Sequence, residues 1–177
     1  RDRINAVLLA EARRKWPDRW RSLRPLPFRL ASWVGYDMDG RTDISWTTSI
    51  GFRLTEKAAR LAGYAAQAKA AGLAELAKKL DAASQHASAR AADFAADLSD
   101  PEALRAAADA LTRNDEAKLI SLTPIIAEIE AAAATAKDDA AQAMLVLAAA
   151  MRADGLGMGW IHFRVNSAQL HNAIRSR

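Results

Sequence analysis

The sequence predicts a mainly α-helical protein, and two observations support this. Alanine, the strongest helix former, accounts for 43 of the 177 residues. Apolar residues recur every three to four positions through most of the chain, which is the period of an amphipathic helix. Cys is absent, which excludes a disulfide scaffold, thiol chemistry and Cys-bound zinc. No run of about 18 apolar residues occurs, so no segment is expected to cross a membrane.

The first region, residues 1–54, is expected to combine one helix with an irregular loop. A helix is predicted over residues 3–15, where apolar residues repeat at helical spacing and basic residues close the C-terminal end. Pro17 is expected to interrupt this helix, and Pro25 and Pro27 end the segment that follows it, because proline disfavours helix in the residue before it. Residues 28–53 are rich in aromatic residues and glycine and contain almost no alanine, which predicts a loop.

The second region, residues 55–154, is expected to form antiparallel helical hairpins whose helices contact one another through alanines and can therefore approach closely. A helix is predicted to start near Thr55, with Leu61, Tyr64 and Gly72 on one face, and its apolar stripe continues from Leu73 toward Leu98. Another helix is expected to start at Ser99, which has the side chain of a cap and a glutamate three residues later. A further helical segment contains Pro124 as a start or a kink. The last ends at Gly155, a typical C-terminal cap.

The third region, residues 155–177, is expected to be a turn, a strand and a helix. Three glycines form the turn, residues 160–165 are aromatic and β-branched, and Asn166 or Ser167 can cap the helix that follows. This is the building block of an α/β barrel of the TIM type or of a doubly wound sheet. The chain offers this strand no evident partner, so we expect the chain to be a piece of a larger, helix-elaborated barrel.

The charge is distributed unevenly along the chain. The net charge is +4, but residues 1–30 carry +6, residues 31–159 carry −5 and residues 160–177 carry +3. Two explanations stay open: the charges are solvated helix faces, or the two basic ends meet and present arginine to an anionic ligand. No recognition helix, zinc finger or aromatic-basic RNA motif is present, so we do not expect a nucleic-acid partner.

Two places in the sequence carry candidate chemistry. Asp37, Asp39 and Asp43 form an Asp-x-Asp-Gly-x-x-Asp loop, which either binds calcium or folds as an Asx turn. The EF-hand pattern fails, because glycine falls at the wrong position and no glutamate closes the loop. Arg164 lies at the C-terminal end of the predicted strand, where barrel enzymes place catalytic side chains. It can bind phosphate or carboxylate through its forked guanidinium, or form a salt bridge to a neighbouring loop.

Two segments together resemble the phosphoenolpyruvate carboxylase family. Ser-Trp-Val-Gly-Tyr-Asp-Met-Asp-Gly-Arg at residues 32–41 is similar to that family's Ser-Trp-x-Gly-Gly-Asp-Arg-Asp-Gly-Asn-Pro signature. Residues 159–167, followed by His171, are similar to its strand with Asp-Ile-Arg-Gln-x-Ser and a later histidine. The sequence departs from the family pattern at Tyr36 (Gly in the family), Met38 (Arg), Arg41 and Thr42 (Asn-Pro) and His162 (Asp).

The resemblance implies a lyase that carboxylates phosphoenolpyruvate with bicarbonate, giving oxaloacetate and phosphate. It also implies Mg²⁺ or Mn²⁺ as cofactor, a homotetramer and a cytoplasmic location. Arg164 would be the catalytic residue that holds the substrate phosphate, and Asp37, Asp39 and Arg41 would contribute to substrate binding. The family's catalytic histidine motif, metal ligands and mobile glycine-rich loop have no counterpart here. We therefore expect the 177-residue chain alone to be inactive.

A second function from another class stays open at this point. The chain would then be a stand-alone helical binding module, in which the loop from Asp37 to Asp43 holds calcium. Calcium requires six to eight oxygen ligands, and three carboxylates supply only part of that number.

Overall fold

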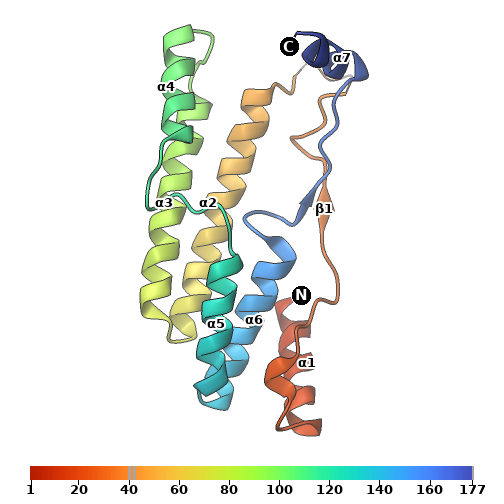
Figure 1. The fold of residues 1–177 in the computed structure, drawn as a ribbon, viewed down its shortest axis with the longest axis vertical. Helices are drawn as coiled ribbons and strands as arrows, with labels where there is room; N and C mark the ends of the chain where they lie inside the picture. Colours follow the sequence, from red (N-terminus) through yellow and green to blue (C-terminus); the bar gives the residue numbers. More distant parts are fainter. Residues whose placement is uncertain (40, 42, 177) are drawn as a thin grey trace.

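The computed structural model describes residues 1–39, 41 and 43–176 and shows an elongated, mainly helical molecule (Figure 1). The prediction of a mainly α-helical protein is confirmed. In chain order the described elements are α1 (Asp2–Lys15), a short 3-10 helix (Trp20–Ser22), β1 (Ala31–Ser32), α2 (Trp46–Ala70), α3 (Ala74–Ala95), α4 (Pro101–Thr112), α5 (Thr123–Thr135), α6 (Asp138–Asp154), β2 (Trp160–Ile161) and α7 (Ser167–Arg175).

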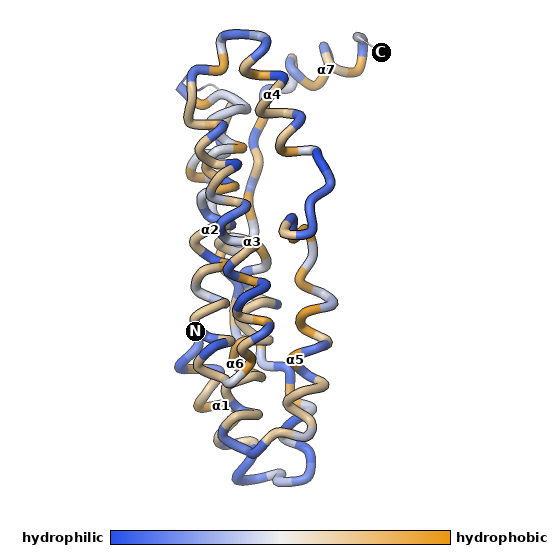
Figure 2. Tube along the Cα trace, turned by 90° about the vertical axis from the view of Figure 1, so that its left-hand side faces the viewer, coloured by the Kyte–Doolittle hydropathy of each residue, from blue (hydrophilic) through white to orange (hydrophobic). Residues whose placement is uncertain are grey.

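Two helical hairpins make the body of the molecule. Helices α2 and α3 run side by side over most of the length, and α5 and α6 pack against their lower half (Figure 1). The α2–α3 turn is made by Gly72, whose φ of +81° lies in the left-handed region that favours glycine. The sequence placed Gly72 on a helix face and predicted hairpins without locating this turn, so the break at Gly72 is a finding of the structure. Turned by 90°, the molecule keeps its long narrow outline, with hydrophobic positions spaced along each helix (Figure 2).

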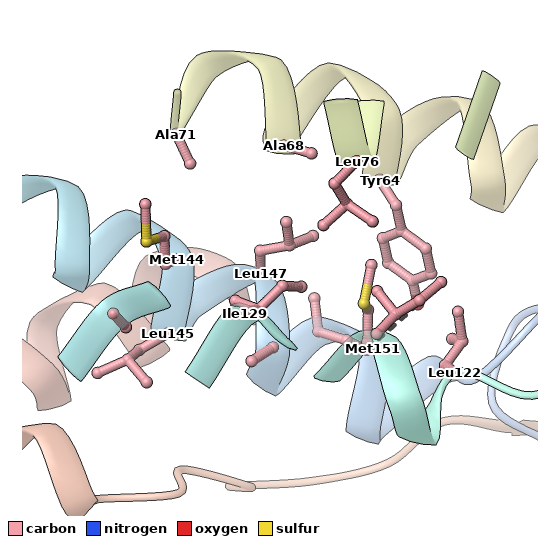
Figure 3. Close-up of a cluster of buried hydrophobic side chains, with 14 of the residues drawn as sticks. Tyr64, Ala68, Ala71, Leu76, Leu122, Ile129, Met144, Leu145, Leu147 and Met151 are labelled. Atoms are coloured by element: carbon pink, nitrogen blue, oxygen red, sulfur yellow. Dashed lines mark hydrogen bonds between the residues drawn. The ribbon is translucent and has the colours of Figure 1, made fainter. Parts of the chain in front are cut away.

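The main hydrophobic core lies between these hairpins. Figure 3 shows Tyr64 of α2, Leu76 of α3, Ile129 of α5 and Met151 of α6 converging on one cluster. Alanines complete this core, because their small side chains let the helices approach closely. A second, smaller cluster of Leu54, Phe94 and Ala107 joins α2, α3 and α4.

Helix α2 begins nine residues earlier than the sequence predicted. Ser45 caps it, since its Oγ accepts a hydrogen bond from the Thr48 amide at 3.1 Å. Residues 46–53 are helical, which corrects the loop predicted there, and the region boundary expected at 54/55 falls inside α2. One of the aromatic residues that suggested a loop, Trp46, packs instead against α3: the rings of Trp46 and Phe94 lie 6.5 Å apart, edge to face.

The other helix ends follow the sequence closely. Asp100 caps α4 by accepting from the Ala103 amide at 3.0 Å, so the cap lies one residue after the expected Ser99. Pro124 lies in the first turn of α5 and starts that helix. Gly155 ends α6 as expected, and Asn166 caps α7 through the Ala168 amide at 2.8 Å.

Basic residues of the first 30 positions bind the acidic middle of the chain. Arg21 donates to the carbonyls of Ala133 and Ala134 at the end of α5, and to Asp138 at 2.8 Å. Arg24 pairs with Glu130 at 2.5 Å. Much of the N-terminal positive charge is thus neutralised within the protein, and is neither simply solvated nor gathered at one anion site. Every helix in the described ranges is too short or too polar to span a bilayer.

Candidate functional site

The strand near the C-terminus is paired within the chain, which corrects the expectation that it lacks a partner. β1 and β2 form a parallel pair, with Ala31 opposite Trp160 and Ser32 opposite Ile161. The Trp160 amide donates to the Leu30 carbonyl at 2.9 Å, and the His162 amide donates to the Ser32 carbonyl at 2.8 Å. In Figure 1 the two strands run alongside each other. The two segments that carry the family resemblance therefore lie side by side.

The pairing continues beyond the strands after a turn. The Arg164 amide donates to the Tyr36 carbonyl at 3.1 Å, and the Met38 amide donates to the Arg164 carbonyl at 2.9 Å. Between the two stretches the first segment turns through Gly35, whose φ is +82°. A Cβ at this position would lie 2.7 Å from the Phe52 ring, so glycine is required by both conformation and space.

Tyr36 anchors this turn to helix α2. Its side chain is buried, and its hydroxyl donates to Oε2 of Glu56 at 2.9 Å. Burial, followed by this hydrogen bond, raises the pKa of Tyr36 far above its ordinary value, so the phenol stays protonated. Ser49 adds a buried hydrogen bond from its Oγ to the Gly35 carbonyl at 2.8 Å. The tyrosine that departs from the family pattern thus fixes the loop in place.

Arg164 lies against the two carboxylates of the loop. Its Nη1 donates to Oδ2 of Asp37 at 3.0 Å, and its Nη2 lies 3.6 Å from Oδ2 of Asp39. Asp37 is mostly covered, whereas the Arg164 side chain remains 56% exposed. Oδ1 of Asp37 accepts from the Asp39 amide at 3.3 Å, which is the expected Asx turn. The cluster therefore holds an arginine in a defined position while leaving its outer edge open to solvent.

Arg41 and Asp43 form a separate exposed pair. Arg41 Nε donates to Oδ1 of Asp43 at 2.8 Å, and its Nη2 pairs with Oδ2 of the same carboxylate. This hydrogen bonding lowers the pKa of Asp43 and raises that of Arg41. Two of the three aspartates proposed as calcium ligands are therefore bound to arginine. Throughout the part of the chain that the structure describes, no three His, Cys, Asp or Glu residues are grouped to hold a metal ion, which gives the calcium hypothesis no support; Gly40 and Thr42 lie outside it.

A buried ionic network holds the glycine turn that leads into β2. Asp154, at the end of α6, accepts from Arg1 through both oxygens at 2.5 Å and lies 3.0 Å from Arg60 Nη1. Arg60 Nε also donates to the Gly157 carbonyl at 2.8 Å. The Tyr64 hydroxyl donates to the Gly155 carbonyl at 2.9 Å. Helix α2 thus positions both segments of the site. It holds the segment around Asp37 through Tyr36, and the segment around Arg164 through this turn.

The segment that carries Arg164 borders an apolar cavity of about 370 Å³ on its other face. Ile161 and Phe163 of this segment line the cavity on one side, and Trp46 and Ile50 of α2 line it on the other. Because side chains alternate along an extended segment, Arg164 projects from the other face. The site therefore has a polar side that carries the aspartates and an apolar side toward the helices.

The histidines contribute little to this cluster. His162 and His171 are exposed. His86 is mostly covered, and its Nδ1 lies 3.5 Å from Oδ2 of Asp115, far along the chain from the loop.

Of the predicted site residues, Asp37, Asp39 and Arg164 come together, whereas Arg41 turns to Asp43. The residues that sequence reasoning missed are the supports: Glu56, Arg60 and Asp154. Asp154 directly precedes Gly155, and an acidic residue just inside a predicted helix end is the one local signal that pointed to it.

Comparison with known proteins identifies no relative of this chain: no protein-family model, curated protein or solved structure matches it.

Proposed function

We propose that the loop around Asp37 and the segment around Arg164 form the phosphate-binding side of a phosphoenolpyruvate carboxylase active site. One observation carries the proposal: the two segments that resemble the family's motifs are in contact through Arg164 and Asp37, 127 positions apart. The contact lies beyond the carboxyl ends of two parallel strands, where ligands bind in α/β enzymes. The resemblance and the geometry are independent supports, because sequence similarity alone does not determine which residues touch.

In the proposed reaction a bicarbonate oxygen attacks the phosphorus of phosphoenolpyruvate. This gives carboxyphosphate and the enolate of pyruvate; the carboxyl group then passes to the enolate carbon and phosphate leaves. Arg164 would hold the phosphoryl oxygens throughout. A guanidinium has five N–H donors, and Asp37 receives a hydrogen bond from only one nitrogen, so the exposed edge is available for a bidentate contact. Asp37 is a positioning residue that fixes the orientation of the Arg164 guanidinium.

The family's Mg²⁺ or Mn²⁺ does not fit the residues at this site. The described part of the chain contains no group of three or more carboxylate or histidine ligands, and Asp37 and Asp43 accept hydrogen bonds from arginines. No step is therefore assigned to a metal here, and the proposal places its ligands outside the described residues. It includes the family's cytoplasmic homotetramer, and it expects no phosphoenolpyruvate turnover from the 177-residue chain alone.

Electrostatics gives the proposal a sharp test. Asp37 and Asp39 together outweigh Arg164 by one negative charge, so phosphoenolpyruvate should bind the isolated chain only weakly. Replacing Asp39 by Asn removes the carboxylate that lies 3.6 Å from Nη2 and should tighten binding several-fold. Arg164→Gln should abolish binding, and Arg105→Gln, an exposed change on α4, should have no effect. Titration followed by ³¹P NMR measures all three.

Activity tests the same assignment in the whole enzyme that carries this chain. Arg164→Gln should lower kcat/KM for phosphoenolpyruvate about 100-fold, the loss expected for a charged hydrogen bond to the transition state. Arg164→Lys keeps the charge but not the fork, and should recover only part of that loss. Normal phosphate release by Arg164→Gln, or turnover by the 177-residue chain itself, would refute the corresponding part of the proposal.

A further inference from the structure

We propose that a second site, separate from the Asp37–Arg164 cluster, binds a small organic anion with an apolar body. A cavity of about 420 Å³ lies where the start of α5, the end of α6 and the segment before β1 come together. Three arginines from three elements line it: Arg29 before β1, Arg53 of α2 and Arg152 of α6. Over the described ranges of the chain, no Asp or Glu lines this cavity.

The three guanidinium groups are incompletely neutralised by the protein. Arg29 makes a cation–π contact with Trp160, 5.6 Å from the ring centroid, which adds no negative charge. Nη1 of Arg53 is buried without a hydrogen bond, and Glu56, 3.5 Å away, already accepts from Tyr36. An anion in the cavity would supply the missing acceptors.

Within the described residues Arg152 is paired with one carboxylate, that of Glu130, and a second arginine binds the same carboxylate. It contacts Glu130 of α5, and Arg24 binds the same Oε1 at 2.5 Å. Burial, and then repulsion from Arg24, lower the pKa of Arg152, which is the direction expected for a cation short of negative charge. Two cations on one carboxylate leave this side of the cavity positive.

The backbone around the cavity is compatible with an anion. The end of α6 would present unfavourable carbonyls, but the Gly155 carbonyl accepts from Tyr64 and the Gly157 carbonyl accepts from Arg60. Helix α5 begins at the opposite wall, with Ser121 and Thr123 lining the cavity. The positive end of this helix and the two hydroxyls favour negative charge there.

Apolar side chains form the rest of the wall and select the kind of anion. Leu122, Ile126 and Met151 line the cavity beside the arginines. Its volume lies within the range of about 300–1,000 Å³ that small-molecule sites occupy. A ligand with both a charged head and an apolar body uses both surfaces, whereas inorganic phosphate uses one. The site lies at the amino end of the two strands, because Arg29 precedes β1, and the Asp37–Arg164 cluster lies at their carboxyl end.

Isothermal titration calorimetry with chosen probes tests this proposal. Phenyl phosphate and benzoate carry the two candidate head groups on the same ring, benzyl alcohol carries no charge, and inorganic phosphate has no apolar body. At least one of phenyl phosphate and benzoate should bind saturably, and its affinity should fall at high salt. Benzyl alcohol and inorganic phosphate should bind at least tenfold more weakly than that anion. The better anion identifies the head group as phosphate or carboxylate.

Matched variants locate the binding. Arg29→Gln and Arg53→Gln should each weaken it about tenfold, the loss expected for one charge-assisted hydrogen bond. Arg29 is exposed, so its replacement should leave the helical circular dichroism unchanged. Arg105→Gln and Arg164→Gln should bind normally. The proposal is overturned by the absence of saturable binding for both anions, by normal binding in the Arg29 and Arg53 variants, or by a loss confined to Arg164→Gln.

Discussion

The α2–α3 hairpin and the paired strip, residues 30–38 with residues 160–164, are held together in different ways. The hairpin is built from apolar residues repeated within each helix, and it buries Leu61 and Leu80 completely. The strip joins segments far apart in the sequence through a few backbone hydrogen bonds, and leaves Trp33 and Trp160 more than half exposed. Local pattern thus determines the scaffold, whereas long-range contacts determine the site.

This difference predicts an uneven distribution of stability. Burial of apolar surface is the main favourable contribution to folding, and it is concentrated in the hairpins (Figure 3). The strip has little buried apolar area of its own and depends on anchors such as Tyr36 and the Asp154 network. It should therefore open more readily than the hairpins, as regions with few buried contacts do.

The largest expected effect comes from the core of the hairpin. Leu80→Ala should lower the free energy of unfolding by about 3 kcal/mol, because it removes a fully buried side chain and leaves a cavity among α2, α3 and their neighbours. Leu30→Ala, in the strip, removes the same atoms from a side chain that is 49% exposed and should cost less than about 1 kcal/mol. Urea unfolding measures both. Equal losses would contradict the proposed distribution of stability.

Two glycines provide a sharper test of the same comparison. Gly159 has φ of +110°, and a Cβ there would lie 2.5 Å from the Leu30 carbonyl oxygen, at the first hydrogen bond of the strip. Gly159→Ala should separate the strands, at a local cost of about 2 kcal/mol for the strained backbone and the collision. Gly63 lies in α2 with open space around its Cβ position, so Gly63→Ala should stabilise the helix by about 0.5–1 kcal/mol.

Amide hydrogen exchange and urea unfolding together separate the two outcomes. In Gly159→Ala the amides of Trp160 and His162 should lose protection while the α2–α3 amides keep theirs. In Gly63→Ala the urea midpoint should rise and the strip should be unchanged. A collapse of global stability in Gly159→Ala would show that the strip is part of the cooperative core.

The sequence predicted the scaffold better than the contacts of the site. Helical period and caps placed α1 and the end of α6 at Gly155, because each depends on neighbouring residues. The start of α2 was missed because its first turns carry aromatics and Gly51 in place of alanine. There, Ser45 capping and packing against Phe94 outweigh composition. Propensity is a weak prior that tertiary contacts override.

The pairing within the strip was missed for a different physical reason. The sequence predicted a strand at residues 160–165, where β2 lies, but β1 is only two residues long, too short for an alternating pattern to reveal, and the paired residues lie 129 positions apart. Asp37, Asp39 and Arg164 were identified from their local pattern and from the resemblance, but the contact between them could not be predicted from spacing. The role of Tyr36 was also hidden, because its partner Glu56 lies on a helix whose start had been misplaced.

The smallest effect tests where local sequence is decisive. Ser99 and Asp100 both have side chains that cap helices, and the sequence favoured Ser99, whereas in the structure the Asp100 carboxylate accepts from the Ala103 amide at 3.0 Å. Asp100→Ala should lower the stability of the protein by about 1 kcal/mol, because it leaves a first-turn amide without its partner. Ser99→Ala should be close to neutral. Thermal unfolding of the two variants side by side decides between the caps: a larger loss for Ser99→Ala would return the start of α4 to the position that the sequence predicted.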